Sequence, residues 1–350
     1  MPLFLWKNVV NLKDVYEKPL LLITFSVLFL VSCGEPPAEV HLSGPTMGTT
    51  YNLKYAPTEL ITPSELQAEI NQELININQL MSTYIQDSEL SRFNQWNSTE
   101  PFPLSAQTIY VMREAKRLGD LSDGILDVTV GPLVNLWGFG PKARPDKIPS
   151  AAEIMAARQR VGLQRLEIRE NSARKTHPNL YVDLSTIAKG YGVDQMADIL
   201  EKHNIHDYLV EVGGEMRLSG RKSNGQPWRV AIEKPLTKER AVERIISVGN
   251  NAIATSGDYR NYYEDAGVRY SHLINPNTGA PINHNLVSVT VVAPSSMTAD
   301  GLATALNVMG KEKALLLSEK YDLAVLLITK EKEGFKEYTS AMFDKLVTIH

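Results

Sequence analysis

The sequence predicts an α+β fold built as a single domain. Apolar residues recur at helical spacing in some segments, as at Leu66, Ile70 and Leu74, whereas residues 287–292 and 323–329 are apolar runs typical of buried strands. The predicted strands are scattered between helices without regular alternation. A doubly wound sheet would need that alternation, so we expect an α+β arrangement instead.

The composition is that of a chain that buries a sizeable core. Its 350 residues are 43% hydrophobic and 22% charged, close to the average for soluble globular proteins. The formal net charge is −4, and the sequence has no basic stripe interleaved with aromatic residues. These features argue against a nucleic-acid partner. The sequence contains no internal repeat and no low-complexity segment.

The first residues have the pattern of a secretory signal. Lys7, Lys13 and Lys18 precede an apolar run at residues 20–31, which is too short to span a bilayer comfortably. The run ends at Cys33 in a sequence that resembles the lipobox of bacterial lipoproteins.

Cys33 is the only cysteine in the chain, so it cannot form an internal disulfide. We predict a lipoprotein signal peptide at residues 1–32, then a lipid-modified Cys33 and a flexible tether at residues 33–44. The folded domain is expected at residues 45–350, on the periplasmic side of a bacterial membrane. Gly34 after the cysteine, rather than Asp, leaves the outer membrane open beside the inner one.

Turn and cap signals organise the first part of this domain. A Gly-Pro turn precedes a strand at residues 49–55, and Met47 beside it is a core residue or lines a flat ligand. Thr62 is the predicted N-cap of a helix, with Pro63 and Glu65 completing a capping box. Tyr84 further on is either a half-buried core residue or a stacking partner.

Ser105 is the predicted N-cap of a second amphipathic helix that runs through Leu118, with Gly119 as its C-terminal stop. Residues 122–140 are rich in glycine, which permits a tight turn or a close approach to a ligand. Residues 181–192 read as a strand end turning into a helix capped by Ser185, a geometry that can bind phosphate. Lys189 on this helix either balances an anion or is a solvated surface lysine.

The next segments read as strands. A Gly pair interrupts the strand at residues 209–217, which indicates a bulge or a close ligand approach. Further strands are expected at residues 228–232 and 252–259, and a strand at 271–279 closes in an Asn-Pro turn. His272 in the last of these is either a structural histidine or a functional one.

A candidate metal site lies near the C-terminal third. Ser296 is the predicted N-cap of a helix that begins at Met297. Asp300 and Thr304 are four residues apart, so both project from one face of that helix. A carboxylate and a hydroxyl are hard oxygen ligands, which suit Mg²⁺ better than zinc or copper. The alternative is that Asp300 has no metal role and is found there because the helix dipole stabilises a negative charge near a helix N-terminus.

Several other chemistries lack their motifs in this sequence. There is no dinucleotide-binding glycine fingerprint, no Walker-type phosphate loop and no His-Glu-x-x-His zinc motif. There is also no Gly-x-Ser-x-Gly nucleophile elbow.

Taken in order, the motif-bearing segments resemble the ApbE family of bacterial flavin transferases. The resemblance extends from about residue 45 to the end of the chain, and each run is weak alone while the ordered set is specific. The matching runs are residues 46–49, 81–84, 88–94, 123–132, 182–191, 213–214, 255–258, 272–279 and 298–300.

The resemblance implies an ApbE-like domain with FAD in a cleft between lobes. It implies Mg²⁺-dependent transfer of the FMN part of FAD to a threonine hydroxyl of a target protein, with AMP leaving. By position, the residues implied to line the FAD site are Met47, Tyr84, Ile125, Leu126, Asp127, Asp183, Lys189 and Ile274. Those implied to bind Mg²⁺ are Asp300 and Thr304 through their side chains and Thr186 through its carbonyl. Either Asp300 or His272 would accept the threonine proton.

The sequence departs from the family at two positions. Ala303 replaces a further acidic residue of some members, and Asn275 replaces the usual Asp of the Asn-Pro turn. Neither change removes the expected site. The acceptors implied by the family are membrane subunits of Na⁺-pumping quinone reductase or related complexes. Two alternatives remain open: an FAD pyrophosphatase that gives FMN and AMP, and a non-enzymatic flavin-binding lipoprotein.

Overall fold

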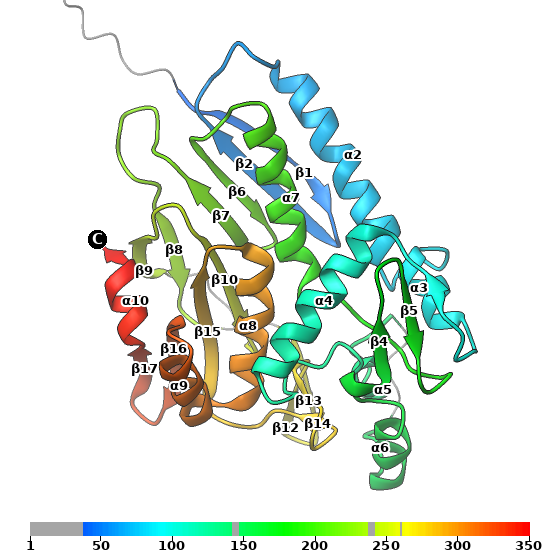
Figure 1. The fold of residues 1–350 in the computed structure, drawn as a ribbon. Coiled ribbons are helices and arrows are strands. Elements are labelled where there is room, and N and C mark those ends of the chain that lie inside the picture. The colour runs from blue at the N-terminus through cyan, green and yellow to red at the C-terminus, as the bar shows by residue number, and fades with distance from the viewer. Residues whose placement is uncertain (1–37, 142–146, 237–241, 260) are drawn as a thin grey trace, which may run out of the picture. The chain divides into compact units, whose positions relative to one another are not determined.

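The computed structural model describes residues 38–141, 147–236, 242–259 and 261–350. Its centre is an eight-stranded sheet in the order β1-β2-β6-β7-β10-β15-β16-β17, in which every neighbouring pair is antiparallel (Figure 1). The strands are β1 (Val40–Thr46), β2 (Thr49–Tyr55), β6 (Tyr208–Val212), β7 (Glu215–Ser219), β10 (Ala252–Gly257), β15 (Leu286–Ala293), β16 (Ala324–Glu331) and β17 (Gly334–Thr339). The antiparallel sheet with segregated helices confirms the predicted α+β class.

Helices cover one face of this sheet (Figure 1). They are α2 (Pro63–Met81), α4 (Ala106–Leu121), α7 (Ala188–Lys202), α8 (Ser296–Met309) and α9 (Lys311–Lys320). Leu66, Ile70 and Leu74 of α2 are buried against β1, β2 and β6, as their spacing predicts.

A smaller sheet, in the order β18-β9-β8, packs on the other face of the central strands with the helix α10 (Ala341–Leu346). Its strands are β8 (Val230–Glu233), β9 (Val242–Ser247) and β18 (Thr348–Ile349). Alternate residues of β16 enter different cores: Val325 and Leu327 pack towards the helices, whereas Leu326 packs towards the small sheet. Burial on both faces explains why β15 and β16 read as continuous apolar runs.

The remaining elements are short. They are α3 (Glu89–Gln95), α5 (Gly131–Leu136), α6 (Ala151–Arg158), the 3₁₀ turn η1 (Leu163–Arg165), and the strands β3 (Phe102–Pro103), β4 (Leu166–Ile168), β5 (Ser172–Lys175), β11 (Tyr262–Asp265), β12 (Val268–Ser271), β13 (Ile274–Asn275) and β14 (Ala280–Pro281).

The predicted N-terminal boundary needs a correction. The tether expected at residues 33–44 overlaps β1, which starts at Val40 and pairs along its length with β2. Met47 and Gly48, both at positive φ, form the turn of the β1–β2 hairpin, so the residues from Val40 onward belong to the folded domain. The predicted signal peptide and Cys33 lie outside the described residues. No helix among the residues described is both long enough and apolar enough to cross a membrane.

Several caps are confirmed and others are wrong. Thr62 forms the capping box with Glu65, and Ser105 accepts from the amide of Thr108. However, α4 runs through Gly119 to Leu121, where a buried glycine packs close to Leu163. Helix α8 begins at Ser296 with Ser295 as its cap, one residue before the prediction.

The Gly213-Gly214 pair is the turn of the β6–β7 hairpin rather than a bulge in one strand. Both glycines have positive φ, of 61° and 111°, which a two-residue hairpin turn favours. The strand end expected before α7 is irregular backbone, and α7 begins at Ala188 with Ile187 at its N-cap position. Ser185 therefore does not cap it.

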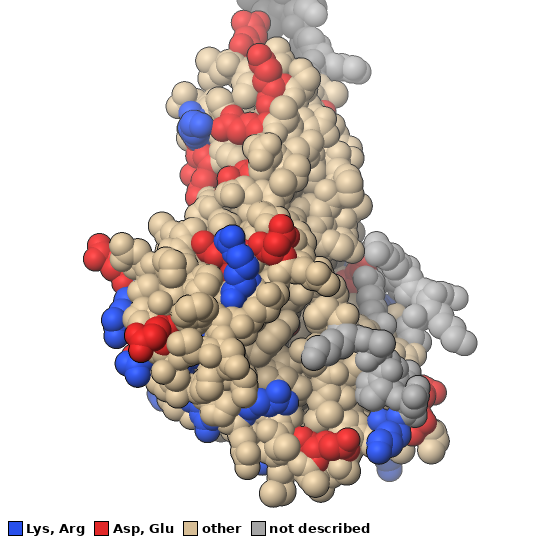
Figure 2. Space-filling model, turned by 90° about the vertical axis from the view of Figure 1, so that its right-hand side faces the viewer, with Lys and Arg blue, Asp and Glu red and all other residues tan. Residues whose placement is uncertain are grey.

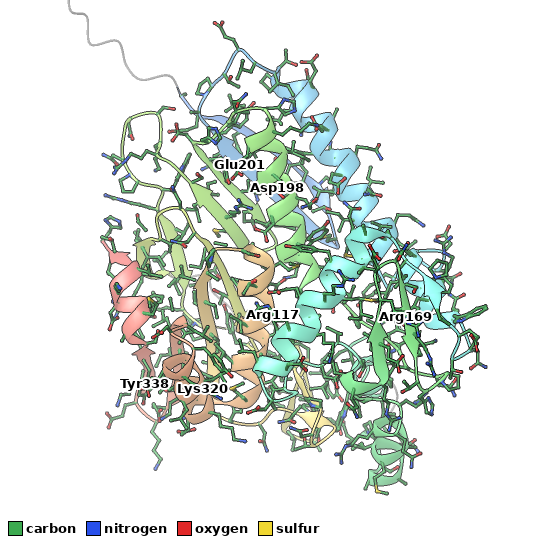
Figure 3. The ribbon with its side chains drawn as sticks, viewed as in Figure 1. Arg117, Arg169, Asp198, Glu201, Lys320 and Tyr338 are labelled. Atoms are coloured by element: carbon green, nitrogen blue, oxygen red, sulfur yellow. The ribbon has the colours of Figure 1, made fainter. Side chains whose placement is uncertain are left out.

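Charges are distributed unevenly on the face that Figure 2 shows. Acidic side chains gather over its upper part, whereas acidic and basic side chains are interspersed below them. Asp198 and Glu201, both on α7 (Figure 3), lie within reach of one arginine, Arg217 of β7, at 3.3 and 3.0 Å.

Candidate functional site

One large cavity, of about 1190 Å³, opens beside the ends of α7 and α8. Strands β2, β6 and β7, the segment 125–139 and the segment 255–276 all contribute to its walls. Every residue that the sequence predicts for the flavin, metal or proton-transfer site lines it: Met47, Tyr84, Ile125, Leu126, Asp127, Asp183, Thr186, Lys189, His272, Ile274, Asp300 and Thr304. The fold thus brings together side chains that are dispersed between residues 47 and 304.

Helices α7 and α8 cap each other at this cavity. Oδ2 of Asp300 on α8 accepts a hydrogen bond of 3.0 Å from the amide of Gly190 in the first turn of α7. In return, Asp194 of α7 accepts hydrogen bonds from the amides of Ser296 and Met297, at 3.0 and 2.9 Å. Gly190 permits the approach, because a Cβ there would lie 2.3 Å from the carbonyl oxygen of Ser296. This exchange fixes the carboxylate of Asp300 at the cavity.

A charged cluster lies beside Asp300. The Nζ of Lys189 is 2.5 Å from Oε1 of Glu215, which is 4% exposed. Burial lowers the pKa of Lys189, but the carboxylates of Asp300 and Glu215 outweigh it, so the net pKa is raised and the lysine stays cationic. Burial raises the pKa of Asp300 to about 7; Lys189 opposes this shift and Glu215 adds to it. A bound cation beside Asp300 would favour its charged form.

His272 directly follows β12, and its imidazole has a defined tautomer. Its Nδ1 lies 3.0 Å from the carbonyl oxygen of Asn261. A carbonyl oxygen only accepts, so Nδ1 carries the hydrogen and Nε2 is unprotonated in the neutral ring. Burial lowers the pKa of His272; the Asn261 carbonyl opposes this and the charge of Lys189 adds to it. His272 can therefore accept a proton at Nε2 near neutral pH.

Two predicted site carboxylates hold turns in the cavity wall. Oδ1 of Asp127 accepts from the amide and the hydroxyl of Thr129, at 2.7 and 2.6 Å. Oδ1 of Asp183 accepts from the amide of Ser185 at 2.9 Å, which is why Ser185 serves this turn and not the helix. The amide of Asp183 donates to the carbonyl of Val128 at 2.7 Å and joins the two turns. Both carboxylates shape the wall through the backbone.

The apolar part of the wall suits a flat ligand. Tyr84 is 68% exposed, so of its two alternatives the half-buried core position is wrong, and its ring is open to a stacking partner. Met47 meets both of its predicted roles, because it packs against the core and also lines the cavity. Ile125, Leu126 and Ile274 supply further apolar surface.

The oxygen ligands at the cavity fit Mg²⁺. Among the described residues, no group of three or more His, Cys, Asp or Glu side chains could hold a metal. Magnesium needs no such group, since substrate phosphates and waters commonly complete a shell begun by one or two carboxylates. Asp300 supplies the carboxylate, and Thr186, which is expected to bind through its carbonyl, also has a buried hydroxyl without a hydrogen-bond partner among the residues described. Ala303 is 1% exposed, belongs to the main core and is not one of the residues that line the cavity.

Sequence reasoning missed two residues of this arrangement, Glu215 and Asp194. Asp194 is an acidic side chain among the mostly apolar buried positions of α7, and that mismatch between charge and burial was the available signal. Glu215 is also buried, but Arg217 and Ser219 share its face of β7, so the sequence pattern gave no signal for it. Asn275 remains useful despite its departure from the family, because its Oδ1 accepts from the amides of Asn277 and Thr278 and holds the turn.

Comparisons with known proteins agree with this geometry. The ApbE family model matches residues 47–327. The FAD:protein FMN transferase of Vibrio cholerae is 57% identical over 319 residues, which are 91% of this chain and 96% of that protein. The corresponding protein of Haemophilus influenzae is 48% identical over 327 residues, or 91% and 94% of the two chains.

Solved structures agree in fold. The flavin transferase ApbE from Vibrio cholerae superposes with a TM-score of 0.83 at 56% identity, over 89% of this chain and all of that one. The apo flavinyl transferase ApbE of Pseudomonas stutzeri gives a TM-score of 0.82 at 39% identity, over 88% of this chain and 96% of that one. The match of family model, sequence and fold over nearly the whole described chain identifies this protein as a member of the ApbE family.

Proposed function

We propose that this protein is an FAD:protein FMN transferase, which moves the FMN part of FAD to a threonine hydroxyl of a target protein and releases AMP. The observation that supports this most strongly is the convergence of every predicted site residue on one cavity. Its volume of about 1190 Å³ is ample for a dinucleotide, since small-molecule pockets are commonly about 300–1,000 Å³.

The proposed reaction is a displacement at phosphorus. The threonine Oγ forms a bond to the FMN-side phosphorus, and the bond between that phosphorus and the bridging oxygen breaks. The bridging oxygen leaves with AMP. The threonine proton passes to Nε2 of His272, which is preferred over Asp300 as the base. Asp300 already accepts the Gly190 amide and is the proposed metal ligand.

The charged groups of the chain serve the pyrophosphate. Lys189 remains cationic and can pair with an anionic oxygen, while Glu215 holds its ammonium group in place. Asp300, Thr304 and Thr186 would hold Mg²⁺, which neutralises charge on the pyrophosphate when bound. Positioning and charge neutralisation account for most catalysis in phosphoryl transfer, so few dedicated side chains are needed.

The first test mixes the full-length protein in detergent with FAD, Mg²⁺ and the soluble domain of a Na⁺-pumping quinone reductase subunit. Flavin fluorescence in a denaturing gel reports covalent transfer. We expect a fluorescent acceptor band that disappears with EDTA or with Asp300→Ala. Release of FMN and AMP without a labelled band would instead establish an FAD pyrophosphatase. Bound FAD without turnover would leave a flavin-binding protein.

The assignment of His272 as base has its own test. His272→Gln should lower the transfer rate by about 100-fold, the size of a general-base contribution, without changing FAD affinity. Because the pKa of His272 is lowered from 6.5, the wild-type rate should fall only in acid below that pH. A rate within a few fold of wild type for the Gln variant would exclude His272 as the base.

We also propose that Cys33 carries a lipid anchor that holds the domain on the periplasmic side of the membrane. The support is the lipobox-like sequence at the end of a short apolar run. Cys33→Ser should shift the protein from the membrane fraction to the soluble periplasmic fraction. Equal membrane retention of wild type and Cys33→Ser would reject the anchor.

A further inference from the structure

The cavity continues as a groove beyond the residues assigned to FAD and metal. Its further lining comes from β2, β6, β7 and β8, including Asn52, Lys54, Leu209, Glu211 and Ala231. The groove is thus continuous with the part of the cavity that holds Lys189 and Asp300, and none of the residues assigned to the flavin site lies on β2, β6, β7 or β8.

The floor of this groove is the face of the sheet that helices leave uncovered. Along β2, Tyr51 and Leu53 are buried against α2 and α7, whereas the intervening Asn52 and the following Lys54 line the groove. The same alternation holds on β6, where Val210 is buried and Leu209 lines the groove. The small sheet covers this face over β7, β10, β15 and β16, and Leu209 and Met216 at its margin are only partly buried.

The wall of the groove is the edge of β8. In the small sheet β8 pairs with β9 on one side, and no other strand of the described residues pairs with it on the other. All residues from 229 to 233 line the cavity, although Val230 and Ile232 have buried side chains and Ala231 an exposed one. Because residues from both faces of β8 line the cavity, it is the backbone edge of this strand that faces the cavity.

The ladder register identifies which backbone groups are unpaired. The amide of His350 donates to the carbonyl of Ile245, so Ile245 directs its backbone groups towards β18. Successive residues alternate in direction, so Ile246 bonds to its partner Val230 on β8. The N–H and C=O of Ala231 therefore point away from β9, into the groove.

We propose that the acceptor protein binds here, with the segment that carries its threonine added as an extended strand along the edge of β8. This inference rests on the proposed transferase function, since the acceptor must bring a hydroxyl to the Lys189 and Asp300 end of the same cavity. Strand addition recognises the main chain, and side-chain pockets add only selectivity. The groove offers such pockets in Leu209 and Met216, and charges of both signs in Lys54 and Glu211.

The test compares two substitutions at one position with the same acceptor domain. Ala231→Pro removes the N–H of an unpaired edge position, where proline is tolerated, whereas Ala231→Val keeps it. We expect Ala231→Pro to raise the KM for the acceptor at least about fivefold, the size of a main-chain hydrogen bond, with unchanged FAD affinity. Ala231→Val keeps the N–H, so its KM for the acceptor should stay clearly below that of Ala231→Pro.

The outcomes separate this inference from the function on which it rests. If wild type labels the acceptor and Ala231→Pro has the wild-type KM, strand addition at β8 is wrong but the transferase stands. If wild type labels no acceptor, the transferase proposal itself fails. If Ala231→Pro does not fold, hydrogen exchange of the wild-type protein provides the test. Binding of an acceptor whose target threonine is replaced by valine, and which therefore cannot react, should slow exchange of the Ala231 amide. Unchanged exchange on adding this acceptor would overturn the proposal.

Discussion

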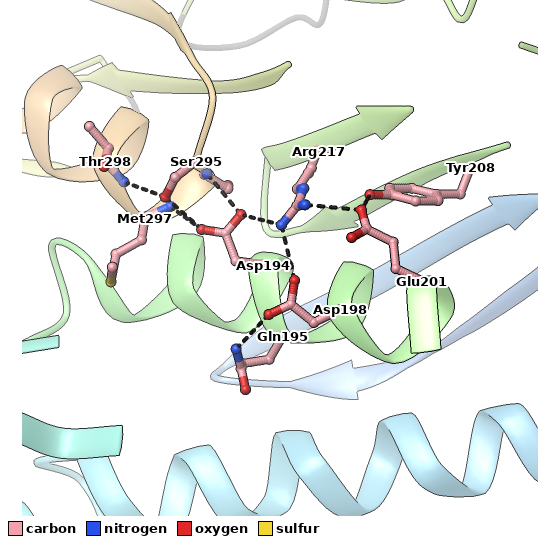
Figure 4. A network of polar contacts seen from close by, with 10 residues as sticks. Asp194, Gln195, Asp198, Glu201, Tyr208, Arg217, Ser295, Met297 and Thr298 are labelled. Atoms are coloured by element: carbon pink, nitrogen blue, oxygen red, sulfur yellow. Dashed lines mark hydrogen bonds and ion pairs between the residues drawn. The ribbon is translucent and has the colours of Figure 1, made fainter. Parts of the chain in front are cut away.

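Replacing Asp194 by Asn should both destabilise the protein and weaken its metal site. Asp194 accepts hydrogen bonds from the hydroxyl of Ser295 at 2.8 Å and from the amides of Ser296 and Met297 (Figure 4). All three donors belong to the N-terminus of α8, and the side chain is almost buried. The negative charge of the carboxylate is also stabilised by the positive, N-terminal end of the α8 dipole.

The magnitude follows from what an amide can replace. Asn keeps one acceptor oxygen, but its NH₂ group would face a donor, so at least one charge-assisted hydrogen bond is lost. Such a bond contributes about 1.5–3 kcal/mol, and the lost helix-dipole interaction about 0.3–1 kcal/mol more. We therefore expect a loss of about 2–4 kcal/mol in the free energy of unfolding.

The chain supplies a matched control in Asp198. It lies one turn further along α7 and also pairs with Arg217, at 3.3 Å against 3.4 Å for Asp194. Its side chain is 56% exposed and bonds to no residue of α8 among those described. Asp198→Asn should therefore cost at most about 1 kcal/mol, as exposed ion pairs do.

Urea unfolding followed by tryptophan fluorescence measures the stability of both variants, and transfer rates across a Mg²⁺ titration measure the site. Because Asp300 lies one turn beyond the contacts of Asp194, Asp194→Asn should raise the Mg²⁺ concentration needed for half-maximal transfer. Equal stability and an equal Mg²⁺ requirement for the two variants would refute the idea that the reciprocal hydrogen bonds between α7 and α8 position Asp300.

Three other substitutions test single contacts. Gly190→Ala should lower the melting temperature, because its Cβ would lie 2.3 Å from the carbonyl oxygen of Ser296. The control Gly192→Ala should be tolerated, because its Cβ would first meet the flexible end of a side chain, at 3.0 Å. Equal melting temperatures for the two variants would contradict this prediction. Burial lowers the pKa of Lys175 from 10.5 to about 8. Between these two pH values the folded chain binds fewer protons than the unfolded chain, so the free energy of unfolding of the wild type should rise with pH. Urea titrations at several pH values should show this rise for the wild type and not for Lys175→Met. Thr304→Val should raise the Mg²⁺ requirement severalfold at unchanged stability, and an unchanged requirement would remove Thr304 from the metal site.

Local signals in the sequence determined much of the secondary structure. The capping box at Thr62 and the cap at Ser105 act within three or four residues of their partners, so they can be read directly. The apolar runs of β15 and β16 are equally direct, because both faces of these strands are buried. The ordered motifs also predicted which residues would meet at one cavity.

Only the tertiary structure decided the rest, because the partners involved are far apart in the chain. The amide of Gly190 is capped by Asp300, 110 residues away, and this contact takes the place of the local cap expected from Ser185. The exposure of Tyr84 and the unpaired edge at Ala231 likewise depend on which segments pack nearby. Residue spacing reports neighbours along one helix or strand, whereas the groove and the exchanged caps arise from elements that meet only in the folded chain.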